Sequence, residues 1–381
     1  MHRVYLDHAS TTPLHPGVLE SMLEIMRGNA GNPSSIHAYG RHMRRIVNEA
    51  RDRIAALLGC QPSELVFTSG GTESDNTALF GAARAMRERG KSHIITTAIE
   101  HHAVLHACEK LQKDGFRVSV VFPDAKGMID PASVRDHISA DTGLISVIYV
   151  NNEIGTIQPI EEIGQLAREC GAVFHVDAVQ ALGSLPVVLN RLPVQLVSFS
   201  AHKINGPQGI GALYIAKGTP FEALLYGGSQ ERKRRAGTEN TAGIAGFAKA
   251  VELAAQEMGS KRNEMEKLRN RFIELLEERL GSSGIAVNGH PKHRVPQIVN
   301  LSFPGTDTET MLMTLDVEGI AAASGSACTS GSLERSHVLK AMELPEALLN
   351  SAIRFSFGMG NTMEEIEYSA KKIATIAARF S

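Results

Sequence analysis

The first group of residues that could do chemistry is the run TSGGTESDN at 68–76, which follows a short apolar segment and opens a helical pattern at 74–86. Glycines such as Gly71 let a backbone approach a ligand closely, and the free N–H groups of a helix start attract phosphate. The hydroxyl of Thr72 can add a hydrogen bond. The same residue types are common in a plain helix cap, so this run alone leaves phosphate binding and capping both open.

The second group is FHVDAVQ at 174–180, where Asp177 falls at the carboxyl end of an apolar run. Open α/β sheets bind ligands at that edge. A carboxylate there can keep the ring nitrogen of pyridoxal phosphate (PLP) protonated, so that the ring accepts electrons, and Gln180 can hydrogen-bond the phenolic oxygen. Taken alone, the motif is better explained by a helix N-cap at Asp177.

The third group is SFSAHKINGPQG at 198–209, which places Lys203 among small and apolar residues. A lysine held out of water has a lowered pKa, because burial disfavours its charged form, and its amine can then form a Schiff base. Most lysines are instead solvated at the surface. The combination favours the chemical interpretation, since a phosphate cradle, a strand-end acid and a later lysine together supply what PLP requires.

A fourth candidate is one of the four cysteines. Cys60, Cys108 and Cys170 lie in apolar or helical patterns, which is typical of cysteines that act as small buried hydrophobes. Cys328 differs, because every other residue of 321–332 is Ala, Ser, Gly or Thr. Such a segment has no large side chain to anchor it, so we expect a mobile loop that presents a reactive thiol.

These residues need a sheet to position them, and the sequence predicts one. Short β-branched runs alternate with longer helical patterns, and most runs are apolar throughout, which indicates strands buried on both faces of a mostly parallel α/β sheet. The runs lie at 65–68, 93–97, 118–122, 144–150, 173–176, 196–200 and 210–215. A turn-rich stretch separates the last two, which allows them to pair antiparallel. A helical pattern at 243–280 leads to a smaller α/β unit with strands expected at 297–303 and 353–357.

Composition excludes several classes of protein. The 39 basic residues nearly balance the 41 acidic ones, which argues against direct nucleic-acid binding and against a general grip on anionic membrane. No apolar run is long enough to span a bilayer, and the first residues lack a signal-peptide pattern. No histidine or cysteine cluster has metal-ligand spacing. We therefore expect a cytoplasmic protein without a metal. The charged run ERKRR at 231–235 is interpreted as a solvated turn near the mouth of the site.

Taken in order, the motifs resemble the cysteine desulfurases of the NifS and IscS type, which belong to the class V aminotransferase-like group of fold-type I PLP enzymes. The resemblance covers nearly the whole chain. It is carried by the segments at 5–13, 31–35, 100–101, 150–155, 175–180, 200–203, 235–240, 324–332 and 353–356. It implies a large PLP-binding domain at 15–255, with a mostly parallel sheet flanked by helices. A smaller α/β domain, made of 1–14 and 256–381, would carry the Cys328 loop.

The resemblance also implies which residues bind the phosphate of the cofactor. Gly71 belongs to the cofactor-binding set, and the side chains of Thr72, Ser200 and His202 would bind the phosphate. Thr238 would reach the same phosphate from the second subunit of a homodimer.

Further roles follow for the ring and the substrate. Lys203 would hold the cofactor covalently, Asp177 would pair with the ring nitrogen and Gln180 with the ring hydroxyl. His101 would stack on the ring face and take part in catalysis; a packed histidine at a strand end is the alternative, and the matching Glu100-His101 context favours stacking. The remaining assignments are substrate contacts: Asn152 (which also contacts the cofactor) and Arg354 would hold the carboxylate of the substrate.

The reaction implied by the resemblance converts L-cysteine to L-alanine. Lys203 would act as base at the substrate Cα, and the Cys328 thiolate would attack the substrate sulfur and keep it as a persulfide. The persulfide would pass to an acceptor protein, either an iron–sulfur scaffold or a tRNA thiolation enzyme. Both stay open, because the chain ends at Ser381 without the longer tail that housekeeping members often use to dock a scaffold. Arg335 stands where the family usually has proline.

Two other functions stay open at this point. One is a different fold-type I enzyme, such as a small-amino-acid aminotransferase or a selenocysteine lyase, and an aminotransferase would have no use for Cys328. The other is a non-catalytic binding or scaffold protein that keeps the fold. The presence of Lys203, Asp177 and His101 argues against the second.

Overall fold

A seven-stranded sheet organises the first two thirds of the chain in the computed structural model, which describes residues 3–28, 30–325 and 335–379. Its strand order is β2-β8-β7-β6-β5-β3-β4, and only β8 runs against the others. The mostly parallel α/β sheet is thus confirmed, as is the antiparallel pairing of the last two strands. The strands are β2 (Leu65–Thr68), β3 (His93–Thr97), β4 (Arg117–Val121), β5 (Thr142–Ile148), β6 (Val173–Asp177), β7 (Leu196–Ser200) and β8 (Gly211–Ile215).

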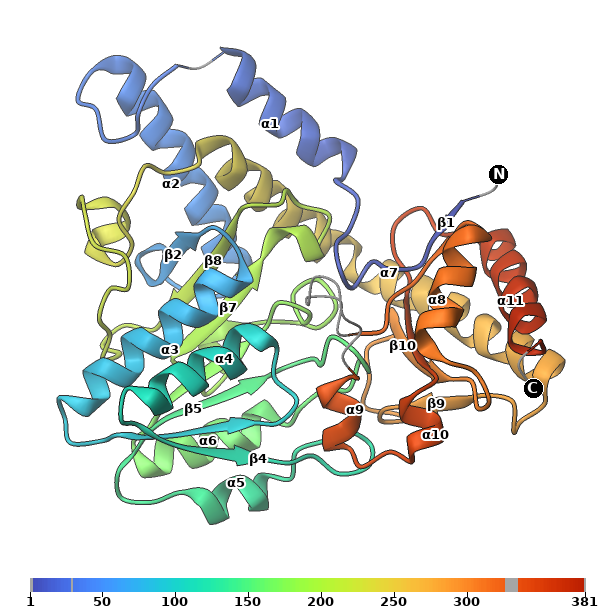
Figure 1. Ribbon diagram of the computed structural model, residues 1–381. Coiled ribbons are helices and arrows are strands. Elements are labelled where there is room, and N and C mark those ends of the chain that lie inside the picture. Colours follow the sequence, from blue (N-terminus) through green and yellow to red (C-terminus); the bar gives the residue numbers. More distant parts are fainter. Residues whose placement is uncertain (1–2, 29, 326–334, 380–381) are drawn as a thin grey trace.

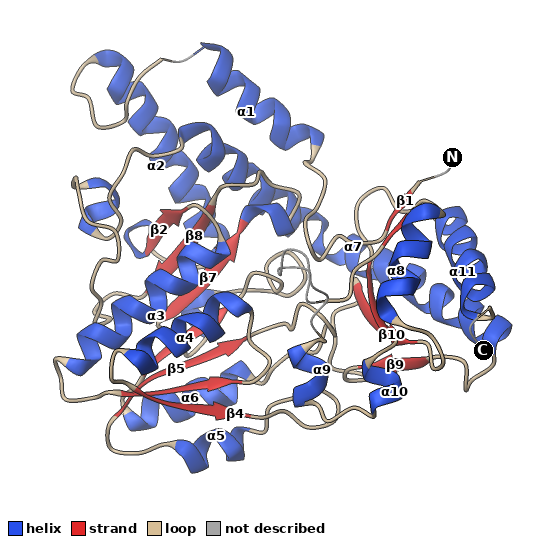
Figure 2. Cartoon of the chain, viewed as in Figure 1, coloured by secondary structure: helices blue, strands red, loops and turns tan. Residues whose placement is uncertain are grey.

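Helices cover both faces of this sheet, which is why every strand except the edge strand β4 is buried along its whole length (Figures 1 and 2). Val66 and Ile94 pack with the helices α3 and α4, whereas their neighbours Phe67 and Ile95 belong to a second cluster on the other face. The helices of this part are α1 (Pro16–Gly28), α2 (Ala38–Leu58), α3 (Gly71–Arg87), α4 (His102–Lys113), α5 (Pro131–His137) and α6 (Ile160–Cys170). Short 3-10 turns occur at η1 (Pro62–Glu64), η2 (Leu189–Arg191), η3 (Ala201–Lys203) and η4 (Gln230–Lys233).

The long helix α7 (Thr241–Leu280) joins two separate hydrophobic clusters. Phe247, near its start, packs in the core of the large sheet, and Phe272, near its end, packs in a smaller core. Gly281 caps the helix, directly after the helical pattern predicted at 243–280. No helix in the described part of the chain has both the length and the apolar run that crossing a bilayer requires.

The smaller core is built from the C-terminal third of the chain together with the N-terminal residues (Figure 1). A three-stranded antiparallel sheet has the order β12-β10-β9, and the short strand β1 (Val4–Tyr5) pairs in parallel with β11 (Ile320–Ala321). We propose domain boundaries near residues 15 and 256. The remaining elements are β9 (Ala286–Asn288), β10 (Ile298–Ser302), α8 (Thr308–Val317), α9 (His337–Ala341), α10 (Glu346–Leu349), β12 (Ala352–Ser356) and α11 (Met363–Ala377).

The prediction of an unanchored segment at 321–332 is wrong for its first residues. Ala321 is part of β11, and Ala323 exchanges two backbone hydrogen bonds with Arg354, at 3.2 and 2.7 Å. Small side chains do not prevent anchoring here, because the backbone itself is paired. Cys328 lies outside the described residues.

The interpretation of 231–235 as a solvated turn is also wrong at its first residue. Glu231 is buried, and its carboxylate accepts two hydrogen bonds from the guanidinium of Arg51, at 2.6 and 2.8 Å. It also accepts one from the backbone N–H of Phe67, at 3.0 Å. The local pattern could not reveal this, because the partner lies 180 residues away.

Removing this buried carboxylate should destabilise the protein strongly. We expect Glu231→Ala to lower the free energy of unfolding by about 3–5 kcal/mol, because Arg51 would remain buried without its counter-charge. Urea unfolding checks this, with Glu49→Ala as control. Glu49 pairs with Arg45 at 3.9 Å on the surface, and its loss should cost about 1 kcal/mol or less. Equal losses in the two variants would contradict the prediction.

Candidate active site

A cavity of about 340 Å³ opens where the strands β5, β6 and β7 end. Because parallel strands present their carboxyl ends at one edge, the residues that follow them converge there. The cavity brings together ten of the residues singled out from the sequence: Gly71, Thr72, His101, Asn152, Asp177, Gln180, Ser200, His202, Lys203 and Arg354. Thr238 is exposed and is not among the lining residues, and Cys328 lies outside the described residues.

The start of α3 forms one wall and is suited to an anion. The helix begins at Gly71, earlier than the pattern at 74–86 predicts, and its first internal hydrogen bond runs from Ser74 N to Gly70 O at 3.0 Å. The preceding N–H groups therefore have no partner within the helix. Gly70 has φ 153° and ψ −173°, a backbone conformation open to glycine. A side chain at Gly71 would also collide with Val179, at 2.8 Å.

A buried hydroxyl faces the same wall. Ser200 Oγ has no hydrogen-bond partner among the described residues, although the side chain is 1% exposed. A buried hydroxyl without a partner costs free energy unless a ligand satisfies it. The helix start and this hydroxyl together fit the phosphate of PLP. Glu73, the acid of the first helical turn, is held by Arg235 at 2.8 Å and by Ser69 N, so its charge is compensated.

Two buried carboxyl groups line the middle of the cavity. Asp177 ends β6 and accepts a hydrogen bond from Val179 N at 2.9 Å, and burial raises its pKa to about 6. Asp75, which the sequence interpretation missed, is 1% exposed, and burial and the charge of Asp177 raise its pKa. An acid of this kind fits the ring nitrogen of PLP, because a protonated nitrogen would compensate the buried charge.

His101 lies at the N-terminus of α4 and faces the cavity. Burial, with a smaller effect from the charge of Lys203, lowers its pKa to about 4, so the ring is neutral near pH 7. Its Nδ1 accepts a hydrogen bond from Ala103 N at 3.1 Å. The proton of the neutral ring therefore resides on Nε2, where it can be donated.

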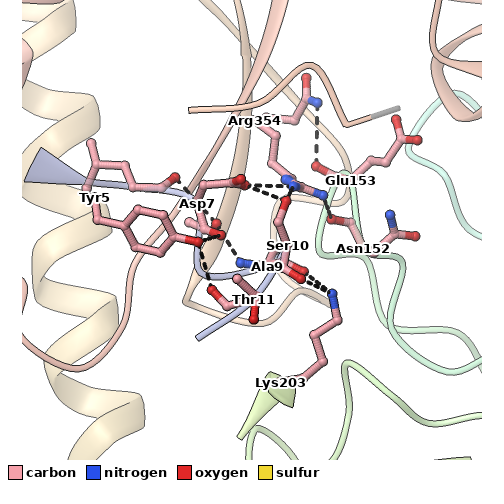
Figure 3. A network of polar contacts seen from close by, with 12 residues as sticks. Tyr5, Asp7, Ala9, Ser10, Thr11, Asn152, Glu153, Lys203 and Arg354 are labelled. Carbon is pink, nitrogen blue, oxygen red and sulfur yellow. Dashed lines mark hydrogen bonds and ion pairs between the residues drawn. The ribbon is translucent and has the colours of Figure 1, made fainter. Parts of the chain in front are cut away.

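Lys203 and Arg354 reach into the cavity from two different elements and contact the same N-terminal segment, residues 7–11 (Figure 3). Lys203 Nζ donates to the carbonyl oxygens of Ala9 and Ser10, at 2.6 and 2.7 Å. Gln180 Nε2 donates to the same Ala9 carbonyl at 2.9 Å, and His202 Nδ1 lies 3.2 Å from Thr11 Oγ1. The amine thus lies beside the candidate ring-binding groups.

Arg354 is 2% exposed and already holds a carboxylate. Its Nη2 donates to Asp7 Oδ1 at 2.8 Å and to Ser10 Oγ at 2.6 Å, while Nη1 donates to the carbonyl of Asn152 at 3.0 Å (Figure 3). The motifs assigned no role to Asp7 or Ser10. Their motif at 5–13 was the available signal. A planar guanidinium in this setting can bind the carboxylate of an amino acid.

A parallel sheet whose carboxyl edge gathers a lysine, an acid and an anion-binding helix start defines the PLP-dependent enzymes of fold-type I. The family model described as "Aminotransferase class-V" matches residues 4–368, and the chain belongs to this family, whose members depend on PLP. The residues present fit that cofactor, as the helix start, Ser200 and Asp177 show.

Similar proteins define the group within the family. The chain is 48% identical to a cysteine desulfurase IscS of Methanosarcina thermophila, over 96% of this chain and 89% of the relative. A solved NifS-like protein superposes with a TM-score of 0.93 at 38% identity, covering 99% of this chain and 100% of the other. SspA in complex with cysteine superposes with a TM-score of 0.82 at 34% identity, covering 93% and 99%.

Proposed function

We propose that this protein is a PLP-dependent cysteine desulfurase, which converts L-cysteine to L-alanine and retains the sulfur as a persulfide on Cys328. One observation carries the proposal. A lysine amine and a buried guanidinium share one cavity, and Gly325, three residues before Cys328, lies in its wall. The NifS and IscS relatives support the same activity, and a structural neighbour binds cysteine.

Four residues act on the substrate, and each has a separate role. Arg354 binds the carboxylate, assisted by Asn152, and this orients the Cα hydrogen toward Lys203. Lys203 Nζ removes that proton. When bound, PLP supplies an electron sink for the charge that develops at Cα. His101 Nε2 can then donate a proton.

Cys328 takes the sulfur. Its thiolate attacks the substrate sulfur, so that a new S–S bond forms while the Cβ–S bond breaks. The electron pair left on the carbon side takes up a proton, and alanine leaves. By chain length alone, three residues beyond Gly325 correspond to at most about 11 Å of backbone, which is short enough for Cys328 to reach a substrate in the cavity.

We further propose a cytoplasmic homodimer in which Thr238 completes the phosphate site of the second subunit. Thr238 is exposed, and Arg235 nearby is bonded to Glu73 at the start of α3, which supports a place for this segment beside a phosphate site. The persulfide sulfur would pass to an acceptor protein of iron–sulfur cluster assembly or of tRNA thiolation. The IscS and NifS names of the relatives favour the first.

Incubation of the holoenzyme with L-cysteine and dithiothreitol tests the activity. We expect L-alanine and sulfide in equal amounts over many turnovers. An aminotransferase would instead need a keto-acid acceptor and would form the keto acid of cysteine without sulfide. A non-catalytic scaffold would form neither product. Either of these last two results would overturn the proposal, and a strong preference for selenocysteine would identify a selenocysteine lyase.

Replacing the guanidinium tests the carboxylate site. We expect Arg354→Lys to raise the KM for L-cysteine about tenfold or more, because lysine keeps the charge but loses the fixed, planar set of donors. Steady-state kinetics measure this, and the cofactor absorbance should stay unchanged. Arg271→Lys, at a half-exposed surface position on α7, is the matched control and should leave the KM unaltered. An unchanged KM in Arg354→Lys would remove this residue from the substrate site.

A further inference from the structure

Glu153 is a buried carboxyl group that touches both ends of the segment carrying Cys328, and no step of the proposed reaction uses it. Ser336 Oγ donates a hydrogen bond to Glu153 Oε2 at 2.5 Å. A side chain added to Gly325 would place its Cβ 2.6 Å from the same oxygen, so the backbone of Gly325 packs directly on the carboxyl group. Gly325 and Ser336 flank residues 326–334 on either side.

The turn that presents Glu153 is held firmly. Asn151 Oδ1 accepts hydrogen bonds from the backbone N–H groups of Glu153 and Ile154, at 2.9 and 3.0 Å. Its Nδ2 donates to the carbonyl of Ile99 at 2.9 Å. Asn151 is fully buried and Glu153 is 1% exposed. The carboxyl group therefore has a fixed place relative to the end of the large sheet, because its turn has few ways to move.

Further bonds connect the same two ends to the substrate pocket. On one side, Ala323 is paired through its backbone with Arg354, the candidate carboxylate ligand. On the other side, His337 Nε2 donates to the carbonyl of Glu100 at 2.9 Å, directly before His101. Gly325, Glu153 and His337 all line the cavity. Glu153 therefore lies between the two residues that flank the segment 326–334, and each flank is hydrogen-bonded to a different side of the site.

We propose that Glu153 is a positioning residue for sulfur transfer, which fixes Gly325 relative to Ser336 and so sets the point from which Cys328 reaches the substrate sulfur. This inference rests on the proposed function. Hydrogen-bond acceptance by the side chain matters here and its charge does not. Burial raises the pKa of Glu153, and an amide of the same shape can also accept a hydrogen bond from Ser336.

Single-turnover kinetics on the PLP-loaded enzyme test the proposal. We expect Glu153→Ala to slow alanine formation about tenfold or more, because a displaced nucleophile loses its near-attack geometry. The cysteine concentration that half-saturates the change in cofactor absorbance should stay within about twofold, since Arg354 and Lys203 are untouched. Glu153→Gln should recover most of the wild-type rate.

A second pair of variants distinguishes loss of positioning from a folding defect in Glu153→Ala. Ser336→Ala removes the same hydrogen bond to Glu153 from its donor side, but it also removes the N-cap of α9. Asp307→Ala is the matched control, because it removes the N-cap of α8, and within the described residues its carboxylate bonds to Thr310 and not to Glu153. Ser336→Ala should be slow and Asp307→Ala should match the wild type.

The outcomes separate this inference from the function on which it rests. A wild-type rate in Glu153→Ala or in Ser336→Ala overturns the positioning role. Equal losses of rate and of cysteine affinity overturn it too, since they would indicate general damage to the pocket. In the same assay, Cys328→Ser reports on the nucleophile. If Cys328→Ser is inactive while Glu153→Ala is fast, only the inference fails, and if Cys328→Ser is fast, the proposed function fails.

Discussion

Lys203→Ala is expected to lower desulfurase turnover by at least about 10⁴-fold, because it removes the amine that holds the cofactor and moves the Cα proton. Its Nζ lies within hydrogen-bond distance of Ala9 O and Ser10 O and has Asp177 and Gln180 as fellow lining residues. No other lysine lines the cavity in the described part of the chain. Alanine and sulfide release from L-cysteine measure the loss.

Lys203→Arg is the matched control for charge. A guanidinium keeps the positive charge and can still donate to the two carbonyls, but it stays protonated near neutral pH and forms no Schiff base. We expect the same inactivity. Both variants should also lose the yellow colour of bound PLP after dialysis, because the cofactor is no longer held covalently. If Lys203→Arg retained a substantial part of the activity, the lysine would act only through its charge, and the covalent role would be wrong.

Cys328→Ser is expected to lower alanine and sulfide production by at least about 10³-fold while cofactor absorbance and cysteine binding stay unchanged. A serine hydroxyl is not ionised near neutral pH and cannot take over the attack on sulfur. Alanine release in a single turnover measures the effect, and it isolates this step from substrate binding.

The other cysteines supply the controls for this experiment. Burial raises the pKa of Cys60 and of Cys108 to about 12, so both thiols stay protonated at pH 8. Cys60→Ser and Cys108→Ser should therefore keep nearly full activity. Full activity in Cys328→Ser would point to an aminotransferase or to another nucleophile, and loss of activity in Cys60→Ser would place the thiol function elsewhere.

Much of the fold could be predicted because six of the seven strands of the large sheet are buried on both faces. Seven runs of four to seven residues become the seven strands of the large sheet, with ends shifted by at most two residues. The start of α3 was predicted late because Gly71 disfavours a helix interior, although it serves well in the first turn. The parallel direction of most strands was predicted from the helical patterns between them, and the antiparallel direction of β8 from the turn-rich stretch that precedes it.

The site was predictable only in part, for a physical reason. Motifs at strand ends reveal residues that a sheet edge brings together, and nine such residues line the cavity, joined by Arg354 from β12. Asp7 and Glu153 were missed because their partners, Arg354 and Ser336, lie 347 and 183 residues away. Arg51 and Glu231 show the same limit, since a buried ion pair between distant residues leaves no local pattern in either segment.

The reach of the N-terminal segment has a consequence for biosynthesis. Asp7 bonds to Arg354, which is made 347 residues later, and Val4 likewise pairs with the distant residue Ile320. At about 5–20 residues per second, roughly 17–70 s separate the synthesis of the two ends of the Asp7–Arg354 bond. A nascent chain therefore carries Lys203 long before it can enclose an amino acid, and catalytic competence begins only after Arg354 has been made and has folded onto Asp7.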